Sequence, residues 1–283
     1  MQMKSLLVLG FGYSATRLAE RLLRQGWRVI GTTRDADKMA LMQAMGVEAL
    51  LWPCDLTEAC LGVSHILASA APDEDGDPFL QADADAIARS GAEWVGYLST
   101  TAVYGDHQGA WVDEETPVTP QSLRAQLRVK AEQQWLALPL CVQVFRLAGI
   151  YGPGRGPFKK VREGTARRVI KPGQVFSRIH VEDIAATLEA SMTQPVRGRI
   201  YNVCDDDPAP PEDVIDYAAG LLGVPSPPEV PYDAAEMSPM ARSFYGESKK
   251  VSNRRIREEL GVCLTYPTYR EGLDGLLRDE TPD

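Results

Sequence analysis

The chain has 283 residues, of which 44% are hydrophobic, so it can bury a sizeable core as one large domain or as one domain with an appendage. Its five cysteines are scattered without a CxxC pair and its three histidines lack a metal-binding spacing, so we expect no disulfide framework, no metal site and a reducing, cytoplasmic location. The formal net charge of −9 disfavours nucleic acid as a partner. No apolar run approaches the roughly 20 residues that cross a bilayer, so we expect no membrane partner.

Apolar runs alternate with amphipathic segments along the first half of the chain. We expect strands at residues 5–9, 28–33, 49–52, 65–70, 94–99 and 141–147, and helices at 15–25, 37–45, 121–136, 181–192, 211–222 and 253–260. The first strand is apolar throughout, as a parallel strand buried on both faces should be. The alternation predicts an α/β fold of the Rossmann type, a doubly wound parallel sheet with a small C-terminal α/β region.

A glycine-rich turn follows the first strand and opens the first helix. It reads Gly10, Phe11, Gly12, Tyr13, Ser14 and Ala15, a GxGxxA pattern. The first glycine permits a tight turn, the second lets the backbone approach a pyrophosphate, and the alanine allows close packing of helix on strand. The pattern predicts dinucleotide binding by these six residues; the alternative is a purely structural turn.

The end of the second strand bears on which dinucleotide is bound. Thr33 stands where an NAD-binding protein usually offers an acid to the ribose, and Arg34 follows, which can meet a 2′-phosphate. NADP is therefore favoured over NAD. In the other interpretation Arg34 is a solvated loop residue and Asp35 serves as the acid.

Four further segments carry a family resemblance. They are Asp55-Leu56, Leu98-Ser99-Thr100-Thr101-Ala102-Val103-Tyr104-Gly105, the run from Arg146 to Arg155 that ends in YGPGR, and Arg178-Ile179-His180-Val181-Glu182-Asp183. With the glycine turn, they make the chain resemble, over nearly its whole length, the extended short-chain dehydrogenase/reductases, in particular the NAD-dependent epimerase/dehydratase branch and its atypical members. The resemblance implies a dinucleotide-binding domain at residues 1–150 and a substrate-binding region at 151–283 that interleaves with the sheet. We also count Asp55, Leu56, Ala70 and Ala71 among the cofactor-binding residues.

The resemblance implies a catalytic group at the end of the fifth strand and another on the helix that follows. A hydroxyl four residues before the VYG tyrosine holds the reacting oxygen in this family, and here that residue is Thr100. The family's YxxxK pair is matched at Lys130, which would hold the nicotinamide ribose, but Gln126 stands in place of the tyrosine and cannot exchange a proton near neutral pH. Tyr104 and Tyr151 are alternative proton donors, each more simply explained by packing, and Lys130 has the alternative of an ordinary surface lysine.

A basic segment runs against the negative charge of the whole chain. Between residues 155 and 178 there are eight cations and one acid, Glu163. Such a segment can draw an anionic substrate to the cleft, and we take Arg155 and Arg178, with Tyr104 and Thr100, as the substrate-binding candidates. The alternative is a solvated basic surface paired with acids such as those at 205–207.

Two functions remain open from the sequence. The first is an NADP-dependent epimerase or reductase acting on an anionic carbonyl or sugar substrate, nucleotide-linked or not, with a degenerate active site. The second is a non-catalytic NADP(H)-binding redox sensor or regulator. A homodimer through the 121–136 helix is compatible with its apolar Leu123, Leu127 and Trp135.

Overall fold

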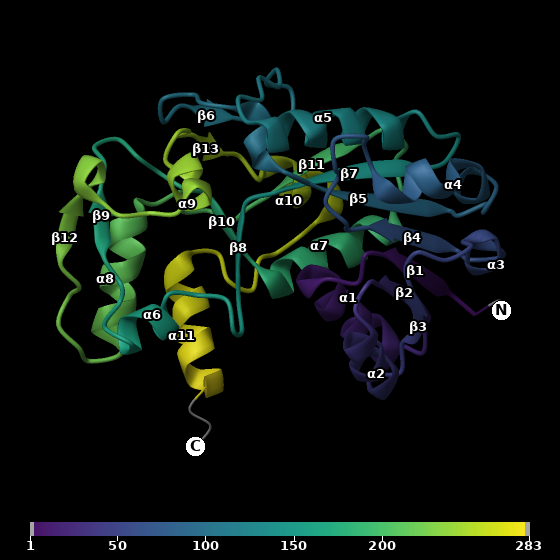
Figure 1. The fold of residues 1–283 in the computed structure, drawn as a ribbon, viewed down its shortest axis with the longest axis horizontal. Coiled ribbons are helices and arrows are strands. Elements are labelled where there is room, and N and C mark those ends of the chain that lie inside the picture. Colours follow the sequence, from purple (N-terminus) through teal and green to yellow (C-terminus); the bar gives the residue numbers. More distant parts are fainter. Residues whose placement is uncertain (1–2, 281–283) are drawn as a thin grey trace.

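The computed structural model describes residues 3–280 and places seven strands in one parallel sheet (Figure 1). Their spatial order is β3–β2–β1–β4–β5–β7–β11, and every neighbouring pair is parallel. The strands are β1 (Ser5–Leu9), β2 (Arg28–Thr33), β3 (Glu48–Leu51), β4 (His65–Ala68), β5 (Trp94–Thr100), β7 (Val142–Leu147) and β11 (Ile200–Val203). The predicted doubly wound α/β fold is confirmed, with its change of winding direction between β1 and β4.

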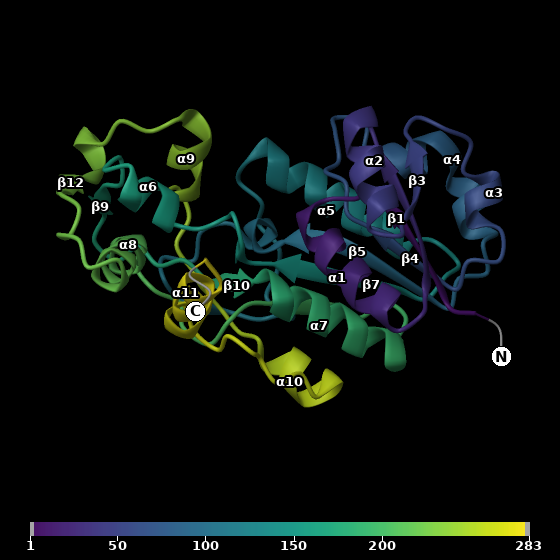
Figure 2. The same ribbon diagram turned by 90° about the horizontal axis from the view of Figure 1, so that it is seen from below.

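Helices cover both faces of this sheet (Figures 1 and 2). One face carries α1 (Tyr13–Arg24), α2 (Ala36–Ala44), α7 (Val181–Thr193) and α10 (Arg254–Leu260), and the other carries α3 (Thr57–Cys60), α4 (Pro78–Ala88) and α5 (Leu123–Leu136). Alternate side chains of β1 serve the two layers: Leu6 and Val8 join the first core, Leu7 and Leu9 the second. This double burial explains why the strand is apolar at every position.

A smaller region packs beside the carboxyl ends of the strands (Figure 2). It contains α6 (Phe158–Arg162), α8 (Pro211–Leu221), α9 (Pro239–Phe244), α11 (Tyr269–Glu280), the short helical turn η2 (Tyr232–Ala234), and the paired strands β9 (Arg168–Ile170) and β12 (Glu229–Pro231). Strands β8 (Gly149–Tyr151) and β10 (Arg178–His180) connect it to the sheet. A further pair joins β6 (Trp111–Val112) to β13 (Lys250–Val251), and the turn η1 (Thr101–Tyr104) directly follows β5. The region has its own apolar core between α6, α8 and α11.

Two of the elements that were missed from the sequence show why. Strand β11 has four residues, too few to show a periodic pattern, yet it pairs with β7 as the seventh strand of the sheet. Helix α11 holds two glycines, which lower helix propensity. A Cβ at Gly272 would lie 2.0 Å from the hydroxyl oxygen of Tyr151, and one at Gly275 would lie 2.7 Å from the ring of Tyr266. The packing of the Tyr151 and Tyr266 rings against α11 therefore requires glycine at both positions, and these same glycines hide the helix from a propensity-based prediction.

The described residues also bear on the excluded classes of site. Within residues 3–280, no helix combines the length and apolar character needed to cross a membrane. No group of three or more His, Cys, Asp or Glu side chains is arranged there to hold a metal ion. All five cysteines are free thiols.

Candidate functional site

The glycine turn is held between β2 and β4, beside the change of winding direction. The backbone N–H of Gly10 donates to Thr32 Oγ1 at 2.8 Å, and the N–H of Phe11 donates to the Thr32 carbonyl oxygen at 2.8 Å. Gly10 has φ of +89°, and a Cβ there would lie 2.9 Å from the backbone nitrogen of Ala70. Both the conformation and the space therefore require glycine at position 10.

Gly12 leaves the beginning of α1 open. It is the N-cap residue, it supplies no side-chain cap, and the first turn of the helix carries no acid. A Cβ at Gly12 would meet only the Gly10 carbonyl oxygen and Ser69 Oγ, each at 3.9 Å. Uncapped N–H groups and the positive end of the helix dipole thus face free space, the arrangement that receives a phosphate. Ala15, about one helical turn after Gly12, is fully buried, and its small side chain allows α1 to approach the sheet.

Two cations lie at the end of β2. The side chain of Arg34 is exposed and has no hydrogen bond or ion pair within residues 3–280. Lys38 donates its ammonium to the Phe11 carbonyl oxygen of the glycine turn. Asp35 is used differently from the sequence alternative: its Oδ1 caps α2, accepting from the N–H groups of Asp37 and Lys38 at 3.0 and 3.3 Å. Thr33 is buried, and its hydroxyl oxygen accepts from the Asp35 N–H.

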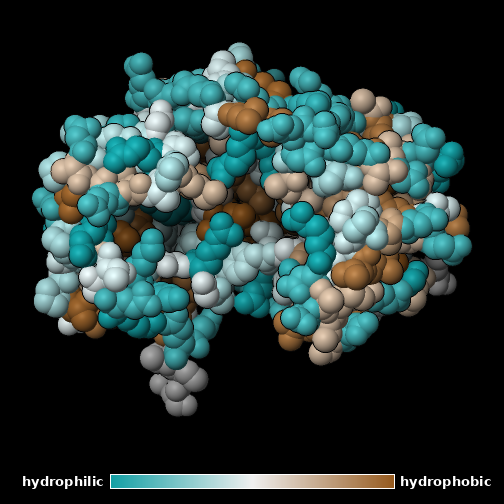
Figure 3. Space-filling view, viewed as in Figure 1, coloured by the Kyte–Doolittle hydropathy of each residue, from teal (hydrophilic) through white to brown (hydrophobic). Residues whose placement is uncertain are grey.

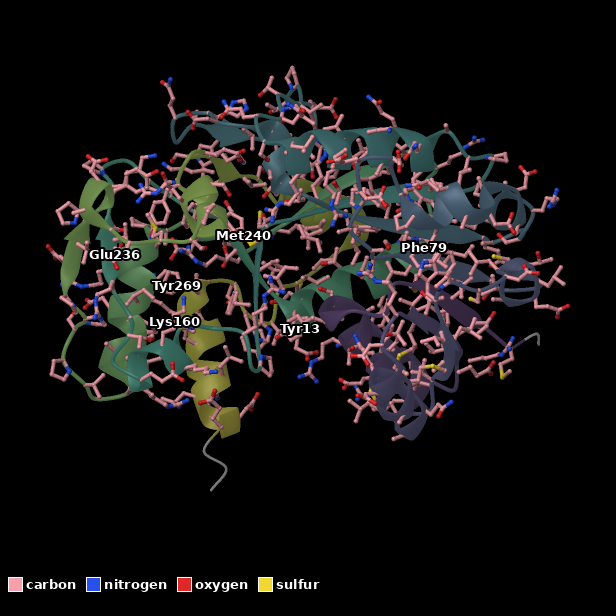
Figure 4. All side chains as sticks on the ribbon, viewed as in Figure 1. Tyr13, Phe79, Lys160, Glu236, Met240 and Tyr269 are labelled. Carbon is pink, nitrogen blue, oxygen red and sulfur yellow. The ribbon has the colours of Figure 1, made fainter. Side chains whose placement is uncertain are left out.

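A cavity of about 780 Å³ opens between the carboxyl ends of the strands and the C-terminal region. Figure 3 shows the corresponding hollow at the centre of the molecule, with apolar residues inside it. The cavity brings together seven of the predicted site residues: Gly12, Tyr13, Ser14, Ala71, Thr100, Arg155 and Arg178. Tyr13 sits where α1 faces the C-terminal region, and its hydroxyl donates to the Pro153 carbonyl oxygen at 3.0 Å (Figure 4).

Asp55, Leu56 and Ala70 lie outside the lining of this cavity. Asp55 follows β3 and is exposed. Its Oδ1 accepts from the N–H of Thr57, the first residue of α3, at 2.8 Å. Leu56 is fully buried in the core. Ala70 packs behind Gly10. These three residues shape the edge of the sheet beside the glycine turn.

Thr100 ends β5 at the floor of the cavity. Its Oγ1 accepts from the Ala102 N–H at 3.2 Å. Since that bond uses a lone pair, the hydroxyl hydrogen remains available to a ligand oxygen. The neighbouring Ser99 also lines the cavity, but its hydroxyl donates to Glu132 Oε1 at 2.5 Å.

The face of α5 that meets the cavity differs from the sequence prediction. Arg124 and Arg128 line the cavity, whereas Gln126 and Lys130 do not. Lys130 is exposed and donates to the carbonyl oxygens of Glu74 and Asp75 at 3.4 and 3.1 Å. The prediction that Lys130 anchors the ribose is corrected, because a shift of two residues turns a side chain by about 200° around a helix.

The spacing of buried residues could have identified this face. Ala125, Glu132 and Trp135 are buried, and they lie three residues before, four after and seven after Arg128. That is the spacing of one helix face. Arg128 is half-buried and donates from Nη1 to the Leu98 carbonyl oxygen at 2.7 Å and to the Tyr97 hydroxyl at 3.2 Å.

Tyr104 is a buried structural residue. It is 0% exposed and does not line the cavity. Its hydroxyl donates to Asn202 Oδ1 at 2.8 Å and accepts from Arg146 Nη1 at 3.0 Å. Arg146 in turn forms a 2.8 Å ion pair with Glu132, and both side chains are 5% exposed. The assignment of Tyr104 to substrate binding is therefore corrected: the VYG tyrosine anchors a polar network beneath the site.

Tyr151 lines the cavity, but its hydroxyl is directed to α11. It donates to the Thr268 carbonyl oxygen at 3.4 Å, and burial raises its pKa far above the usual range. His180 caps α7, accepting at Nδ1 from the Glu182 N–H at 3.3 Å. Burial lowers the pKa of His180 to about 4, so it is neutral near pH 7. Both residues are structural in this geometry.

The basic segment divides into two parts. Arg155 and Arg178 line the cavity. Arg155 is exposed, with its guanidinium 5.7 Å from the centre of the Tyr13 ring. Arg178 is half-buried and donates from Nη1 to the carbonyl oxygens of Phe176 and Ala209 at 2.8 and 3.1 Å. The other six cations lie outside the lining, and the acids at 206 and 207 pair with Arg257 and Arg270 instead.

Of the α5 residues in the predicted dimer contact, one is exposed and another is buried. Leu123 is 60% exposed, as an interface residue would be. Trp135 is 0% exposed and donates from Nε1 to Asp77 Oδ2 at 3.0 Å. Trp135 therefore belongs to the core and is removed from the proposed dimer surface.

Comparison with known proteins gives relatives along the whole chain. No protein-family model matches. Protein YeeZ of Escherichia coli K12 is 29% identical, covering 94% of this chain and 97% of its own. A 3-diazoavenalumate denitrifying reductase of a Streptomyces species is 29% identical over 57% of this chain and 58% of its own.

Solved structures extend the likeness. A conserved protein of unknown function from Silicibacter pomeroyi DSS is 59% identical, with a TM-score of 0.93 over 98% of this chain and 99% of that one. A protein from Methylobacillus flagellatus, described as a candidate NAD-dependent epimerase/dehydratase, is 26% identical, with a TM-score of 0.75 over 99% of both chains. MoeE5, in complex with UDP-glucose and NAD, shares the fold at 18% identity, with a TM-score of 0.77 over 98% of this chain and 99% of that one.

The fold and the glycine turn define a Rossmann-type protein with the architecture of NAD-dependent epimerases and reductases. Its structural neighbours are members of the NAD-dependent epimerase/dehydratase family, and the resemblance predicted from the sequence motifs is confirmed.

Proposed function

We propose that the protein is an NADP-dependent oxidoreductase of the epimerase/reductase type that acts on an anionic carbonyl or sugar substrate. One observation carries the proposal: the open beginning of α1 at Gly12, the hydroxyl of Thr100 and the guanidinium of Arg178 all face one cavity of about 780 Å³. The names of two relatives support a reductase or a sugar-nucleotide enzyme: the Streptomyces denitrifying reductase and the MoeE5 complex with UDP-glucose and NAD.

The residues present suit a nicotinamide dinucleotide. When bound, the cofactor supplies or accepts a hydride. The N–H groups at the beginning of α1 would hold the pyrophosphate, and Thr100 would donate its hydroxyl hydrogen to the reacting oxygen. Arg124 and Arg128 would stabilise negative charge on that oxygen, but a guanidinium stays protonated and cannot supply the proton. In this proposal the proton on the reacting oxygen would come from water, directly or through the Thr100 hydroxyl.

The preference for NADP rests on the end of β2. Arg34 is unpaired within the described chain, Lys38 lies against the glycine turn, and Asp35 is engaged as a helix cap. Two cations, with the acid at the ribose position committed as a helix cap, suit a 2′-phosphate better than an unmodified ribose. The free cysteine thiols are consistent with a protein that acts in the reducing cytoplasm.

A second candidate is a non-catalytic NADP(H)-binding regulator. The observation that favours it is the pair of arginines on α5, which leaves no tyrosine or histidine on that helix face to transfer a proton. In this case the cofactor would bind without turnover, and binding of a partner would depend on its redox state.

The test is to titrate the protein with NADPH and NADH, and then to incubate the NADPH-bound protein with a panel of anionic carbonyl compounds and nucleotide sugars. We expect tighter binding of NADPH than of NADH, and oxidation of NADPH that requires one of the added compounds. Tight NADPH binding with no turnover across the panel supports the regulator. Failure to bind either dinucleotide overturns both functions.

A further inference from the structure

The half of the cavity farthest from the glycine turn has an aromatic wall. Phe176 and Tyr245 meet edge to face, with ring centres 5.4 Å apart and ring planes at 73°. Phe244 of α9 also lines the cavity and is 47% exposed. Val175 and Val251 also line the cavity. Rings presented edge to face in this way form a surface on which another planar ring can pack.

Three polar side chains beside this wall, Ser177, Ser243 and Lys249, have protein partners. Ser177 Oγ accepts from the Val251 N–H at 3.0 Å, and the Ser243 hydroxyl donates to the Met240 carbonyl oxygen at 2.7 Å. Lys249 donates from Nζ to Glu247 Oε2 at 2.6 Å and to the Gly105 carbonyl oxygen at 2.7 Å. The Ser177 hydroxyl hydrogen and one N–H of the Lys249 ammonium stay unused within residues 3–280, so what these two side chains can still offer a ligand is donors.

Two guanidinium groups beside the aromatic wall, those of Arg178 and Arg124, have N–H donors without a hydrogen-bond partner within residues 3–280. Arg178 commits Nη1 to two carbonyl oxygens, and no other hydrogen bond involves its guanidinium within residues 3–280. Arg124 has no hydrogen bond or ion pair there; its guanidinium lies 5.2 Å from the centre of the Phe244 ring. Burial raises the pKa of the nearby Asp205 carboxyl to about 8, so at neutral pH that acid offsets little of the charge on Arg178.

The lining is poorly suited to a polyhydroxylated sugar. Among the described residues that line the cavity there is no Asn, Gln, Asp or His, and the one acid, Glu247, is paired with Lys249. Sugar hydroxyls are recognised by acceptors as well as donors, and a site built for them leaves such groups waiting. In the aromatic half of this cavity the unused charged groups are the guanidinium donors of Arg124 and Arg178, beside aromatic rings, and no unpaired carboxylate or amide accompanies them among the described lining residues.

We propose that this half of the cavity binds an aromatic carboxylate, with the ring against Phe176, Tyr245 and Phe244 and the carboxylate held by Arg178 or Arg124. This inference rests on the proposed function, since it names the substrate class of the same site. A planar carboxylate matches the paired donors of a guanidinium, and an aryl ring matches the wall.

The test begins with NADP⁺ binding to the full chain, and then measures by calorimetry the affinity of the NADP⁺-saturated protein for three probes. The probes are 3-phenylpropionate, its neutral amide 3-phenylpropionamide, and UDP-glucose. We expect the carboxylate to bind about ten- to hundredfold more tightly than the amide, the usual effect of charge-assisted hydrogen bonds, and more tightly than UDP-glucose.

Three variants locate the binding. Arg178→Gln and Phe176→Leu should each weaken 3-phenylpropionate binding about tenfold or more, and Arg124→Gln, on an exposed side chain, gives an independent test if Arg178→Gln fails to fold. Lys160→Ala is the matched control, because this cation of the basic segment lies on α6 outside the cavity lining (Figure 4). The affinity of this variant for 3-phenylpropionate should be unchanged.

The outcomes separate this inference from the function on which it depends. If NADP⁺ fails to bind, the proposed function fails with it. If NADP⁺ binds but UDP-glucose outcompetes the carboxylate, if the amide binds as well as the acid, or if no probe binds, the aromatic carboxylate is overturned and the oxidoreductase stands.

Discussion

Arg128 of α5 donates a hydrogen bond of 2.7 Å to the backbone carbonyl oxygen of Leu98 in β5, two residues before Thr100. The same Nη1 lies 3.4 Å from the Ala70 carbonyl oxygen, after β4. One guanidinium thus ties a helix to the ends of two neighbouring strands at the edge where Thr100 faces the cavity. The side chain that positions this edge is an arginine, two residues away from the lysine that sequence matching selected.

This geometry predicts different effects for two cations of one helix. Arg128→Ala should lower the free energy of unfolding by about 1–3 kcal/mol, because it leaves the Leu98 carbonyl oxygen without its charged donor, and it should weaken NADPH binding. Lys130→Ala should change stability by less than about 0.5 kcal/mol and leave NADPH affinity unchanged. Urea unfolding and fluorescence titration measure both. A strong loss of NADPH binding in Lys130→Ala would restore the sequence assignment.

The glycine turn allows binding and stability to be separated. Gly12→Ala should fold normally, since φ at Gly12 is −108° and the added methyl meets nothing closer than 3.9 Å. It should weaken NADPH binding about tenfold or more, because the methyl occupies the space that the pyrophosphate needs.

Gly10→Ala is the contrasting variant. Its φ of +89° and the 2.9 Å approach to Ala70 predict a loss of about 1–3 kcal/mol in stability. Normal NADPH affinity in a well-folded Gly12→Ala protein would contradict the placement of the pyrophosphate.

Sequence reasoning succeeded where a pattern repeats along one element. The apolar run of β1 and the glycine turn predicted the sheet, its first strand and the open beginning of α1. It failed where the deciding contact is long-range. Nothing local to Tyr104 shows that its hydroxyl is used by Asn202, which lies 98 residues later. The aromatic wall could not be predicted for the same reason, because Phe176 and Tyr245 come from separate segments that only the fold brings together.

The choice between NADP and NAD is tested at the end of β2. Arg34→Ala should weaken NADPH binding about ten- to hundredfold and leave NADH binding unchanged, because the lost interaction is with the 2′-phosphate alone. Arg24→Ala, which removes an exposed cation at the far end of α1, is the control. Equal weakening of NADH and NADPH in Arg34→Ala would argue that the side chain does not contact the 2′-phosphate.

The Arg146–Glu132 ion pair should dominate the stability of the network beneath the site. Replacing one partner, as in Glu132→Leu, leaves a charge that is 5% exposed without compensation and should cost about 3–5 kcal/mol. The double variant Glu132→Leu with Arg146→Met should cost much less than the sum of the single variants, because it leaves no unpaired charge. Urea unfolding of all three measures the coupling, and additive losses would show that the two charges act independently.

The buried Asp205 carboxyl predicts a loss of stability as the pH rises from about 4 to about 8. Its side chain is 1% exposed, Oδ2 has no hydrogen-bond partner, and burial raises its pKa from 3.8 to about 8. The folded protein therefore retains a proton that the unfolded chain has released, so this group destabilises the fold progressively as the pH rises from about 4 to about 8. Asp205→Asn should raise the Tm most above pH 8 and little near pH 4. The same Tm difference at both pH values would contradict the buried, protonated carboxyl.

The same ionisation should reach the anion site through Arg178. Asp205 is the acid with the largest electrostatic effect on Arg178, so its deprotonation offsets the positive charge that faces the cavity. The affinity for 3-phenylpropionate, whose own carboxylate is ionised throughout, should therefore fall as the pH rises through about 8. Asp205→Asn should remove this decline, whereas it should not alter the affinity of the neutral amide. A decline that persists in Asp205→Asn would assign the titration to another group and leave Arg178 unaffected by Asp205.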